Sequence, residues 1–267
     1  MSTPTPTGTV LDRILEARIR EVEHRKKVLP ETALKYGAKA AEPLRDFSAA
    51  LLKPATNVIA ELKPASPSRG VIRDPFDPVA LGTSLEGAGA AALSVLTEGA
   101  FFGGSLKNLR DARKSIQLPV LRKDFIFDTW QVWETRANDA DSFLLIVAAL
   151  QDAQLVELIA LGRQIGMDPV VEVHTSQELD RALKAGSKII GVNNRSLKTL
   201  DVRVETSFEL IEQIPEECIA VSESGIRTAD EIAKLRAAGF DAFLIGTSLM
   251  LAPDPAVALA ELLSSKR

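Results

Sequence analysis

The stretch NVIAELKPASPSRG, residues 57–70, joins a short apolar run to a loop of proline, serine and glycine. The run contains β-branched residues and is bounded by turn residues, as expected of a buried strand. Glu61 and Lys63 stand at its end, and burying an unpaired charge costs several kcal/mol. These two charges are therefore expected either to pair with each other or to bind a ligand.

The same order of apolar run, polar break and helical stretch recurs along the chain. Strands that alternate with helices at this spacing predict a parallel sheet with helices outside, and eight units over roughly 220 residues fit a closed (β/α)8 TIM barrel. An open doubly wound sheet is the alternative. No G-x-G-x-x-G follows the first run and no G-x-x-x-x-G-K-[ST] occurs, so the nucleotide-binding open sheets lack their phosphate loops and the barrel is favoured. The predicted strands are 57–62, 91–96, 119–125, 142–147, 169–174, 188–193, 218–223 and 242–246.

The segment before the barrel predicts helices. From Thr9 to Pro30, apolar residues recur at helical spacing and charged residues occupy the other face, which indicates an amphipathic helix. A second helical stretch, EPLRDFSAALL, leads into the first strand. We therefore expect an N-terminal extension over residues 1–45 and a barrel over residues 46–267, forming one domain overall.

Composition and charge restrict the partners. The chain has 267 residues, 46% of them hydrophobic, and a net charge of -4, which argues against a general nucleic-acid or anionic-membrane surface. It contains no basic leader with a long apolar segment and no uninterrupted apolar stretch near about 18 residues, so the cytoplasm is the expected location. Cys218 is the single cysteine, so the chain cannot form an intramolecular disulfide. It stands at the start of a predicted strand, at the end of the barrel opposite the active site, and is therefore not expected to be a nucleophile. A small ligand is expected.

Polar residues collect where the predicted strands end, and active sites of this architecture lie at the C-terminal ends of the strands. Because side chains alternate along a strand, Glu61 and Lys63 should point into the barrel mouth, while Val58, Ala60 and Leu62 face the helices. Other members of the group are Lys123, Glu172, His174, Asn193, Arg195, Glu223 and Ser224.

Two loops predict an anion site. SESGI (222–226) follows the seventh run and GTSLM (246–250) follows the eighth, and both offer small residues whose backbone N–H groups can approach a phosphate. The segment TSLM is placed to open a short helix, whose N-terminus favours negative charge. These loops are the usual phosphate site of the barrel, so a phosphorylated substrate is expected.

The charges at the strand ends favour proton transfer. Glu61, Glu172 and Glu223 should surround Lys63 and Lys123, and nearby negative charge stabilises the ammonium form of lysine. A Schiff-base lysine requires the opposite, a lowered pKa. No metal site is expected, because two ammonium groups would compete with the cation, and His174 is interpreted as a structural residue.

Seven segments, taken in order, carry a resemblance that covers the barrel and the N-terminal extension. They are VIAELKPASPSRG, LSVLTEGAFFGGSL, PVLRKDFI, VVEVH, GVNNRSLKT, VSESGI and FLIGTSLM. In these segments the chain closely resembles the indole-3-glycerol phosphate synthase family. The resemblance implies a carboxy-lyase of tryptophan biosynthesis that needs no cofactor. It would convert 1-(2-carboxyphenylamino)-1-deoxyribulose 5-phosphate into indole-3-glycerol phosphate by ring closure, decarboxylation and dehydration.

The resemblance also implies roles for the catalytic residues. Lys123 would be the general acid toward the ribulose oxygen, and Lys63 would hold the substrate carboxylate and donate a proton during dehydration, although the sequence does not divide these steps between the two lysines. Glu172 would be the general base. The residues implied to orient the lysines and the substrate hydroxyls are Glu61, Asn193 and Glu223.

The remaining implied residues bind the substrate. The phosphate would lie against Ser66, Ser224, Gly225, Gly246 and Thr247, with Arg195 at the edge. The anthranilate ring would lie between Phe125, Leu144 and Leu197. The chain departs from the family at Pro64, where relatives often carry a basic residue.

Other readings stay open on sequence alone. Phosphoribosylanthranilate isomerase would use a Cys and an Asp, and the tryptophan synthase α subunit would use carboxylates without a lysine pair; neither pattern is present. A lysine Schiff-base aldolase and a non-catalytic phosphosugar-binding barrel are the remaining alternatives. The outer helices show no decisive apolar stripe, so a monomer or a weak homodimer is expected.

Overall fold

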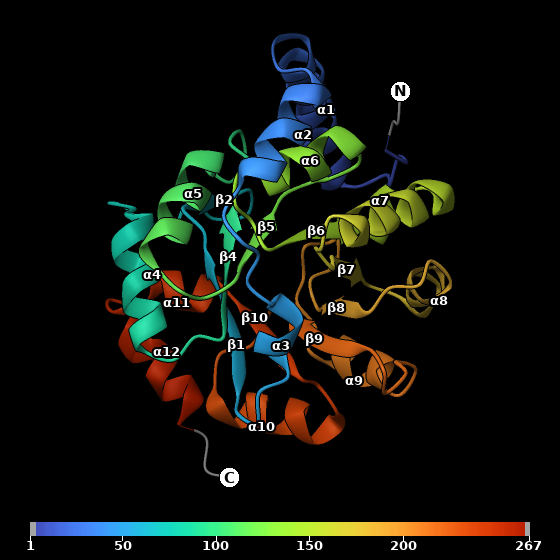
Figure 1. The fold of residues 1–267 in the computed structure, drawn as a ribbon. Helices are drawn as coiled ribbons and strands as arrows, with labels where there is room; N and C mark the ends of the chain where they lie inside the picture. The colour runs from blue at the N-terminus through green and yellow to red at the C-terminus, as the bar shows by residue number, and fades with distance from the viewer. Residues whose placement is uncertain (1–3, 265–267) are drawn as a thin grey trace.

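The chain forms a closed barrel of eight parallel strands, seen in Figure 1 as a ring of strands surrounded by helices. This computed structural model describes residues 4–264. Going round the barrel from β1, the neighbours are β10, β9, β8, β7, β6, β5 and β4, which pairs again with β1. The strands are β1 (Asn57–Leu62), β4 (Ala92–Leu96), β5 (Val120–Lys123), β6 (Ser142–Ile146), β7 (Val170–Val173), β8 (Ile189–Asn193), β9 (Ile219–Glu223) and β10 (Ala242–Ile245).

All eight predicted strands are confirmed, each within two residues at either end. The loop after β1 contains a small antiparallel pair, β2 (Ala65–Ser66) and β3 (Gly70–Val71), which the sequence did not indicate. The barrel is therefore the predicted one, with an ordered loop beside its first strand.

Side-chain alternation divides the apolar core into two layers. Val58, Ala60 and Leu62 pack in the layer between strands and helices, as predicted, whereas Ile59 and Leu121 belong to the barrel interior. The charged residues at the end of β1 continue the inward-facing series, which brings them to the barrel mouth.

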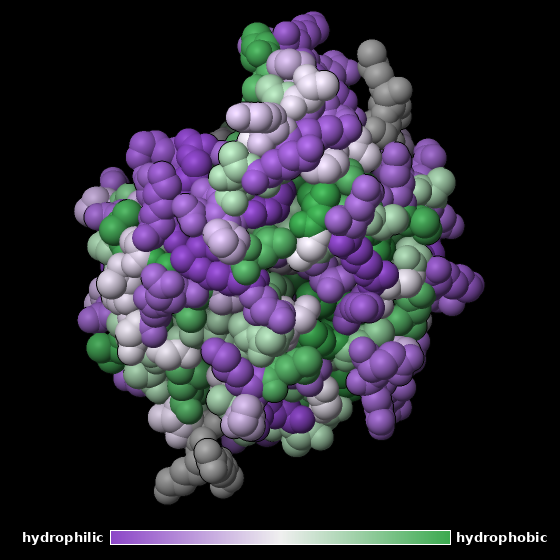
Figure 2. All heavy atoms as spheres, viewed as in Figure 1, coloured by the Kyte–Doolittle hydropathy of each residue, from purple (hydrophilic) through white to green (hydrophobic). Residues whose placement is uncertain are grey.

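The outer helices begin at side-chain caps. Asp77 and Asp254 accept hydrogen bonds from the first-turn N–H groups of α4 and α12, and both helices have proline at the first position, where a missing N–H costs nothing. The helices outside the barrel are α4 (Pro78–Gly87), α5 (Leu106–Ser115), α6 (Thr129–Ala137), α7 (Asp152–Gln164), α8 (Ser176–Lys184), α9 (Glu205–Ile211), α10 (Ala229–Ala238), α11 (Thr247–Leu251) and α12 (Pro255–Leu263), and a 3-10 turn, η1 (Val147–Ala149), follows β6. On the face in Figure 2, hydrophilic side chains cover much of their outer surface.

Three helices precede the barrel. The predicted amphipathic helix is confirmed as α1 (Val10–Val28), and it ends before Pro30. The second predicted stretch is helical only over α3 (Phe47–Leu51), because Asp46 caps a helix that starts there. The sequence did not indicate α2 (Glu31–Ala40), which lies beside α6 in Figure 1. Of the helices within residues 4–264, none has the length and apolar character needed to cross a membrane.

Candidate active site

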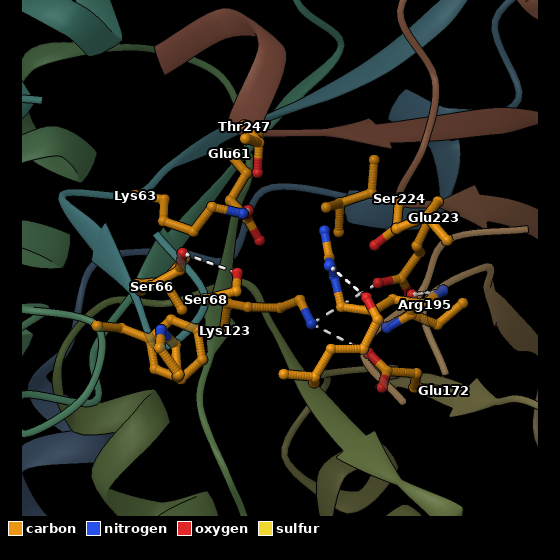
Figure 3. A pocket seen from close by; sticks show the side chains of 18 of the residues that line it. Glu61, Lys63, Ser66, Ser68, Lys123, Glu172, Arg195, Glu223, Ser224 and Thr247 are labelled. Carbon is orange, nitrogen blue, oxygen red and sulfur yellow. Dashed lines mark hydrogen bonds and ion pairs between the residues drawn. The ribbon is translucent and has the colours of Figure 1, made fainter. Parts of the chain in front are cut away.

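A cavity of about 460 Å³ opens at the C-terminal ends of the barrel strands. Figure 3 shows labelled side chains converging there, with Lys123 between Glu61 and Lys63 on one side and Glu172 and Glu223 on the other. The structure brings together all fifteen residues singled out from the sequence, and each of them lines this cavity: Glu61, Lys63, Ser66, Lys123, Phe125, Leu144, Glu172, Asn193, Arg195, Leu197, Glu223, Ser224, Gly225, Gly246 and Thr247.

Lys123, the last residue of β5, lies among carboxylates. Its Nζ is 3.0 Å from Glu172 Oε2 and 3.6 Å from Glu223 Oε2. Burial alone would lower the pKa of Lys123, but the negative charges of Glu172, Glu223 and Glu61 outweigh it and raise the pKa above its ordinary value. Lys123 therefore carries a proton at neutral pH and can donate it.

The two glutamates beside Lys123 have opposite protonation tendencies. Burial opposes ionisation of Glu172, but the charges of Lys123 and His174 outweigh it and lower its pKa. Burial and the neighbouring carboxylates of Glu172 and Glu61 raise the pKa of Glu223 to about 8. When the pKa values of two neighbouring carboxyl groups are shifted in opposite directions, the ionised group can act as a base and the protonated group can donate a hydrogen bond.

Glu61 and Lys63 pair with each other and also face the cavity. Lys63 Nζ lies 2.5 Å from Glu61 Oε2, and both side chains are largely buried. A Cβ added to Gly246 would lie 2.1 Å from the same Glu61 oxygen, so only glycine leaves room for this carboxylate. The sequence predicted that the charges of Glu61 and Lys63 either pair with each other or bind a ligand. In the structure they pair with each other, and the pair lines the cavity.

The loop after β9 has an unusual backbone. Ser224 has a φ of 67° and Gly225 one of 88°, and left-handed values are uncommon for residues other than glycine. Asn194, buried behind this loop, holds it: Nδ2 donates to Ser224 O at 3.0 Å and Oδ1 accepts from Ser207 N at 3.0 Å. The strained turn directs small residues into the cavity, as functional sites often require.

Comparison with known proteins gives the family. A family model described as Indole-3-glycerol phosphate synthase matches residues 11–262. The chain belongs to the indole-3-glycerol phosphate synthase family. A protein of that name from Laribacter hongkongensis is 45% identical over 258 residues, covering 95% of this chain and 98% of its own. Another from Chlorobium chlorochromatii is 47% identical over 249 residues, covering 92% and 97%.

Solved structures of other proteins share only the fold. 3-Hexulose-6-phosphate synthase from Salmonella typhimurium has a TM-score of 0.64 at 12% identity, covering 79% of this chain and 98% of its own. The tryptophan synthase alpha chain from Legionella pneumophila has a TM-score of 0.58 at 15% identity, covering 84% and 96%. The barrel fold is thus shared with proteins of other names, whereas the family of this chain rests on the family model and on the relatives that are 45–47% identical.

Several residues of the cavity wall were not found from the sequence. Val10, Leu11 and Ile14 reach it from α1, and Arg69 and Arg227 reach it from the loops after β1 and β9. The apolar spacing of α1 was visible in the sequence, but spacing does not tell which surface a helix covers. Arg69 lies within the segment VIAELKPASPSRG and Arg227 directly follows VSESGI, so their closeness to the segments that carry the family resemblance was the available signal.

A buried ionic network joins α1 to the strand that carries Lys123. Asp124 Oδ2 lies 2.7 Å from Arg18 Nη2 and 2.8 Å from Arg122 Nη2, and it accepts a hydrogen bond from Thr97 Oγ1. Arg122 also contacts Glu134 Oε2 at 2.8 Å. Because side chains alternate, Arg122 points away from the cavity that Lys123 lines, while Asp124 lies in the cavity wall with its carboxylate in the buried network. The network fixes the cavity-lining helix of this indole-3-glycerol phosphate synthase family member against the strand that carries Lys123.

The structure also shows the positions of His174 and Cys218, which the sequence analysis discussed but did not assign to the site. His174 follows β7 and lies 3.1 Å from Glu178, at the end of its strand as predicted. Cys218 is the residue before β9, at the end of the barrel opposite the cavity, also as predicted. Among the described residues, no group of three or more His, Cys, Asp or Glu side chains is arranged to hold a metal ion.

Replacing Asn194 by alanine is expected to destabilise the turn at Ser224. The change removes the hydrogen bond to the part-buried carbonyl of Ser224 and the bonds that the buried Asn194 amide oxygen accepts from the N–H and hydroxyl of Ser207, which costs roughly 1–3 kcal/mol of unfolding free energy. Urea unfolding measures this loss. Gln213→Ala is the matched control, because it removes one exposed amide hydrogen bond and should change the free energy by less than about 0.5 kcal/mol. Equal stability of the two variants would contradict the bracing role of Asn194.

Proposed function

We propose that this protein converts 1-(2-carboxyphenylamino)-1-deoxyribulose 5-phosphate into indole-3-glycerol phosphate, carbon dioxide and water. It would act as a carboxy-lyase of tryptophan biosynthesis. The observation that carries the proposal is the position of Lys123 between Glu172 and Glu223, facing the Glu61–Lys63 pair across one cavity. This arrangement supplies acids and a base on opposite sides of a bound substrate.

The lysines act where negative charge develops. When the ring carbon that bears the carboxylate attacks the ribulose carbonyl, the oxygen becomes negative, and the Lys123 ammonium stabilises it and gives it a proton. Lys63 holds the carboxylate until carbon dioxide leaves and serves as the second acid, for the hydroxyl lost as water. The raised pKa of Lys123 supports this role, because an acid must be protonated when the substrate arrives.

Glu172 acts as the base. Loss of carbon dioxide restores the benzene ring; loss of the hydroxyl as water and of a proton from the neighbouring carbon then completes the indole, and the ionised Glu172 accepts that proton. Glu223, whose pKa burial and the neighbouring carboxylates raise, orients Lys123 and a substrate hydroxyl. Glu61 and Asn193 orient Lys63 and the substrate chain.

The substrate is a small phosphorylated molecule, and the cavity offers matching walls. Ser224 and Gly225 follow β9 and Thr247 opens α11, so backbone N–H groups are available to the phosphate. Arg69 and Arg227 add positive charge at this edge. The other residues proposed for the phosphate are Ser66, Gly246 and Arg195, and those proposed for the anthranilate ring are Phe125, Leu144 and Leu197.

Formation of the fluorescent indole product tests this function. Purified protein is mixed with the carboxyphenylamino substrate, and indole fluorescence should appear at a rate proportional to enzyme concentration. If no fluorescence appeared at high enzyme concentration, the synthase activity would be excluded, and a non-catalytic phosphosugar-binding barrel would be the remaining alternative. A borohydride-stable adduct on Lys63 or Lys123 would favour the Schiff-base aldolase, which the raised pKa of Lys123 already disfavours.

We further propose that residues 1–45 form an extension of a single domain whose barrel spans 46–267. The Arg18–Asp124 ion pair and the packing of Leu11 and Leu15 in one apolar cluster with the interior residues of the barrel support one folded unit. We also propose that the protein is a monomer or a weak homodimer and that it acts in the cytoplasm. No nucleic-acid or membrane partner is proposed. Analytical ultracentrifugation measures the oligomeric state.

A further inference from the structure

A second cavity of about 650 Å³ lies beside the first. Asn193 and Leu197 line both cavities, so the loop after β8 belongs to the wall between them. Glu172 lines the first cavity, whereas His174 and Glu178 line the second. These three side chains therefore span the distance from one cavity to the other.

The three side chains are in contact with one another in series. Glu172 Oε1 lies 3.4 Å from His174 Nε2, and His174 Nδ1 lies 3.1 Å from Glu178 Oε2. Their side-chain exposure rises along the series, from 2% for Glu172 to 9% for His174 and 18% for Glu178. The contacts thus lead from the buried base toward solvent.

The local sequence fixes this geometry. Glu172 and His174 are two positions apart at the end of β7, which places them on one face. Thr175 caps α8, and Glu178 in the first turn accepts the backbone N–H of His174 at 2.8 Å. His174 Nε2 is buried and has no hydrogen bond to any other residue that the structure describes, so its free position faces Glu172.

A base that has taken a proton must lose it before the next turnover. Lys123 lies next to Glu172, but as an ammonium ion it has no lone pair and can accept a proton only after donating its own. The substrate and product fill the first cavity during the reaction. The other oxygen of Glu172 faces His174.

We propose that His174 and Glu178 relay the proton taken up by Glu172 out of the active site and into the second cavity. This inference rests on the proposed function, in which Glu172 is the base. His174 is a positioning and relay residue, since it lines the second cavity and not the substrate cavity.

The steps balance in protons. Protonated Glu172 gives its proton to Nε2 of the neutral imidazole, which becomes an imidazolium ion, and Glu172 returns to the carboxylate. The imidazolium then releases one ring proton to the Glu178 carboxylate or to water in the second cavity. No other bond forms or breaks, and the lysines regain their protons from solvent.

The charges around His174 suit this exchange. Burial lowers the pKa of His174, but the hydrogen bond to Glu178 and the charges of Glu172, Glu178 and Glu223 outweigh it and raise the pKa. Positive charge faces it as well, from Lys123 beyond Glu172 and from Arg181 on α8. The loop after β8 adds Lys198, Asp201 and Arg203 at the second cavity. The raised pKa favours uptake of a proton by the imidazole, and the Glu178 carboxylate beside Nδ1 can take a proton from it in turn.

Truncation with chemical rescue tests the relay. His174→Ala should lower kcat by roughly 10- to 100-fold, the size of effects from residues that support a catalytic group, with KM changed little. Free imidazole added to the buffer should restore kcat as its concentration rises, because it can enter the opened second cavity. The pH at which kcat reaches half its maximum should also differ from that of the wild type.

His24→Ala is the matched control. His24 is the only other histidine in the sequence and is exposed on α1, so this variant should keep wild-type kcat and show no stimulation by imidazole. Full kcat in His174→Ala at every pH would overturn the relay. A lower kcat with no imidazole rescue and an unshifted pH profile would overturn it too, since a structural role predicts that result.

A measurement without turnover separates this proposal from the proposed function. With two histidines in the chain, NMR of the free protein resolves the imidazole of His174 once His24→Gln has identified the other signal. The pKa of His174 should fall in both Glu172→Gln and Glu178→Gln. An unchanged pKa in both variants would refute the relay alone, whether or not His174→Ala folds, whereas absence of product in the wild type would refute the proposed function on which the relay rests.

Discussion

Replacing Lys123 by methionine should lower kcat for indole-3-glycerol phosphate formation by at least about a hundredfold, the lower range for loss of an acid catalyst. Methionine keeps much of the side-chain length but has no proton to give to the ribulose oxygen. The change also removes the charge that lies 3.0 Å from Glu172, so the pKa of that base should rise and its ionised fraction should fall. Both consequences act in the same direction on turnover.

Lys123→Arg separates charge from proton donation. Arginine keeps a positive charge near Glu172 and Glu223 but does not deprotonate in the working pH range, so it cannot act as the acid. We expect Lys123→Arg to bind substrate and still turn over at least about a hundredfold more slowly. Steady-state fluorescence assays give kcat and KM for both variants.

Lys184→Met is the control for this series. Lys184 is exposed on α8 and pairs with Asp180 at the surface, so its loss should leave kcat unchanged. If Lys123→Met kept near-normal turnover, Lys123 would not be the acid, and Lys63 would be the remaining candidate among the two lysines of the cavity.

The sequence was sufficient to predict the barrel and the position of the candidate site, for a physical reason. Side chains point to opposite faces of a strand in turn, so once Glu61 is placed on the inward face, the direction of every other side chain in that strand follows. Parallel strands place their C-terminal ends at one side, so Lys123 and Glu172 had to meet near the same mouth. Neither step required knowledge of distant contacts.

The parts that the sequence did not indicate depend on contacts between distant segments. Arg18 and Asp124 are 106 positions apart, and no local pattern pairs them. Asn194 stands next to the predicted Asn193, but its bracing role depends on the fold of the loop after β9. The raised pKa of Glu223 likewise follows from burial among other carboxylates, which only the folded chain creates.

The network around Asp124 should account for a large share of stability. Replacing Asp124 by alanine removes the buried carboxylate 2.7 Å from Arg18, which keeps only its pair with the half-exposed Glu21, and removes one of the two carboxylates that pair with Arg122. Removing one partner of a buried ion pair typically costs about 3–5 kcal/mol, because the remaining charge is left desolvated. Urea unfolding at neutral pH should show a loss of this size. Asp111→Ala is the control, since its pair with Lys107 is exposed and such pairs contribute about 0–1 kcal/mol.

The effect of Asp124→Ala should itself depend on pH. Burial would raise the pKa of Asp124, but Arg18 and Arg122 outweigh it and lower the pKa to about 2 from an ordinary value of 3.8. A carboxyl group with a lowered pKa in the folded state stabilises the protein above its unfolded pKa, and this contribution, about 2 kcal/mol, is lost as the pH falls from about 4 toward 2. The unfolding free energy of the wild type should therefore fall more steeply than that of Asp124→Ala over this range. Parallel curves would mean that Asp124 is not held ionised by the two arginines.

Replacing Asp124 by alanine should also raise KM, because Arg18 holds α1, and Leu11 and Ile14 of that helix line the substrate cavity.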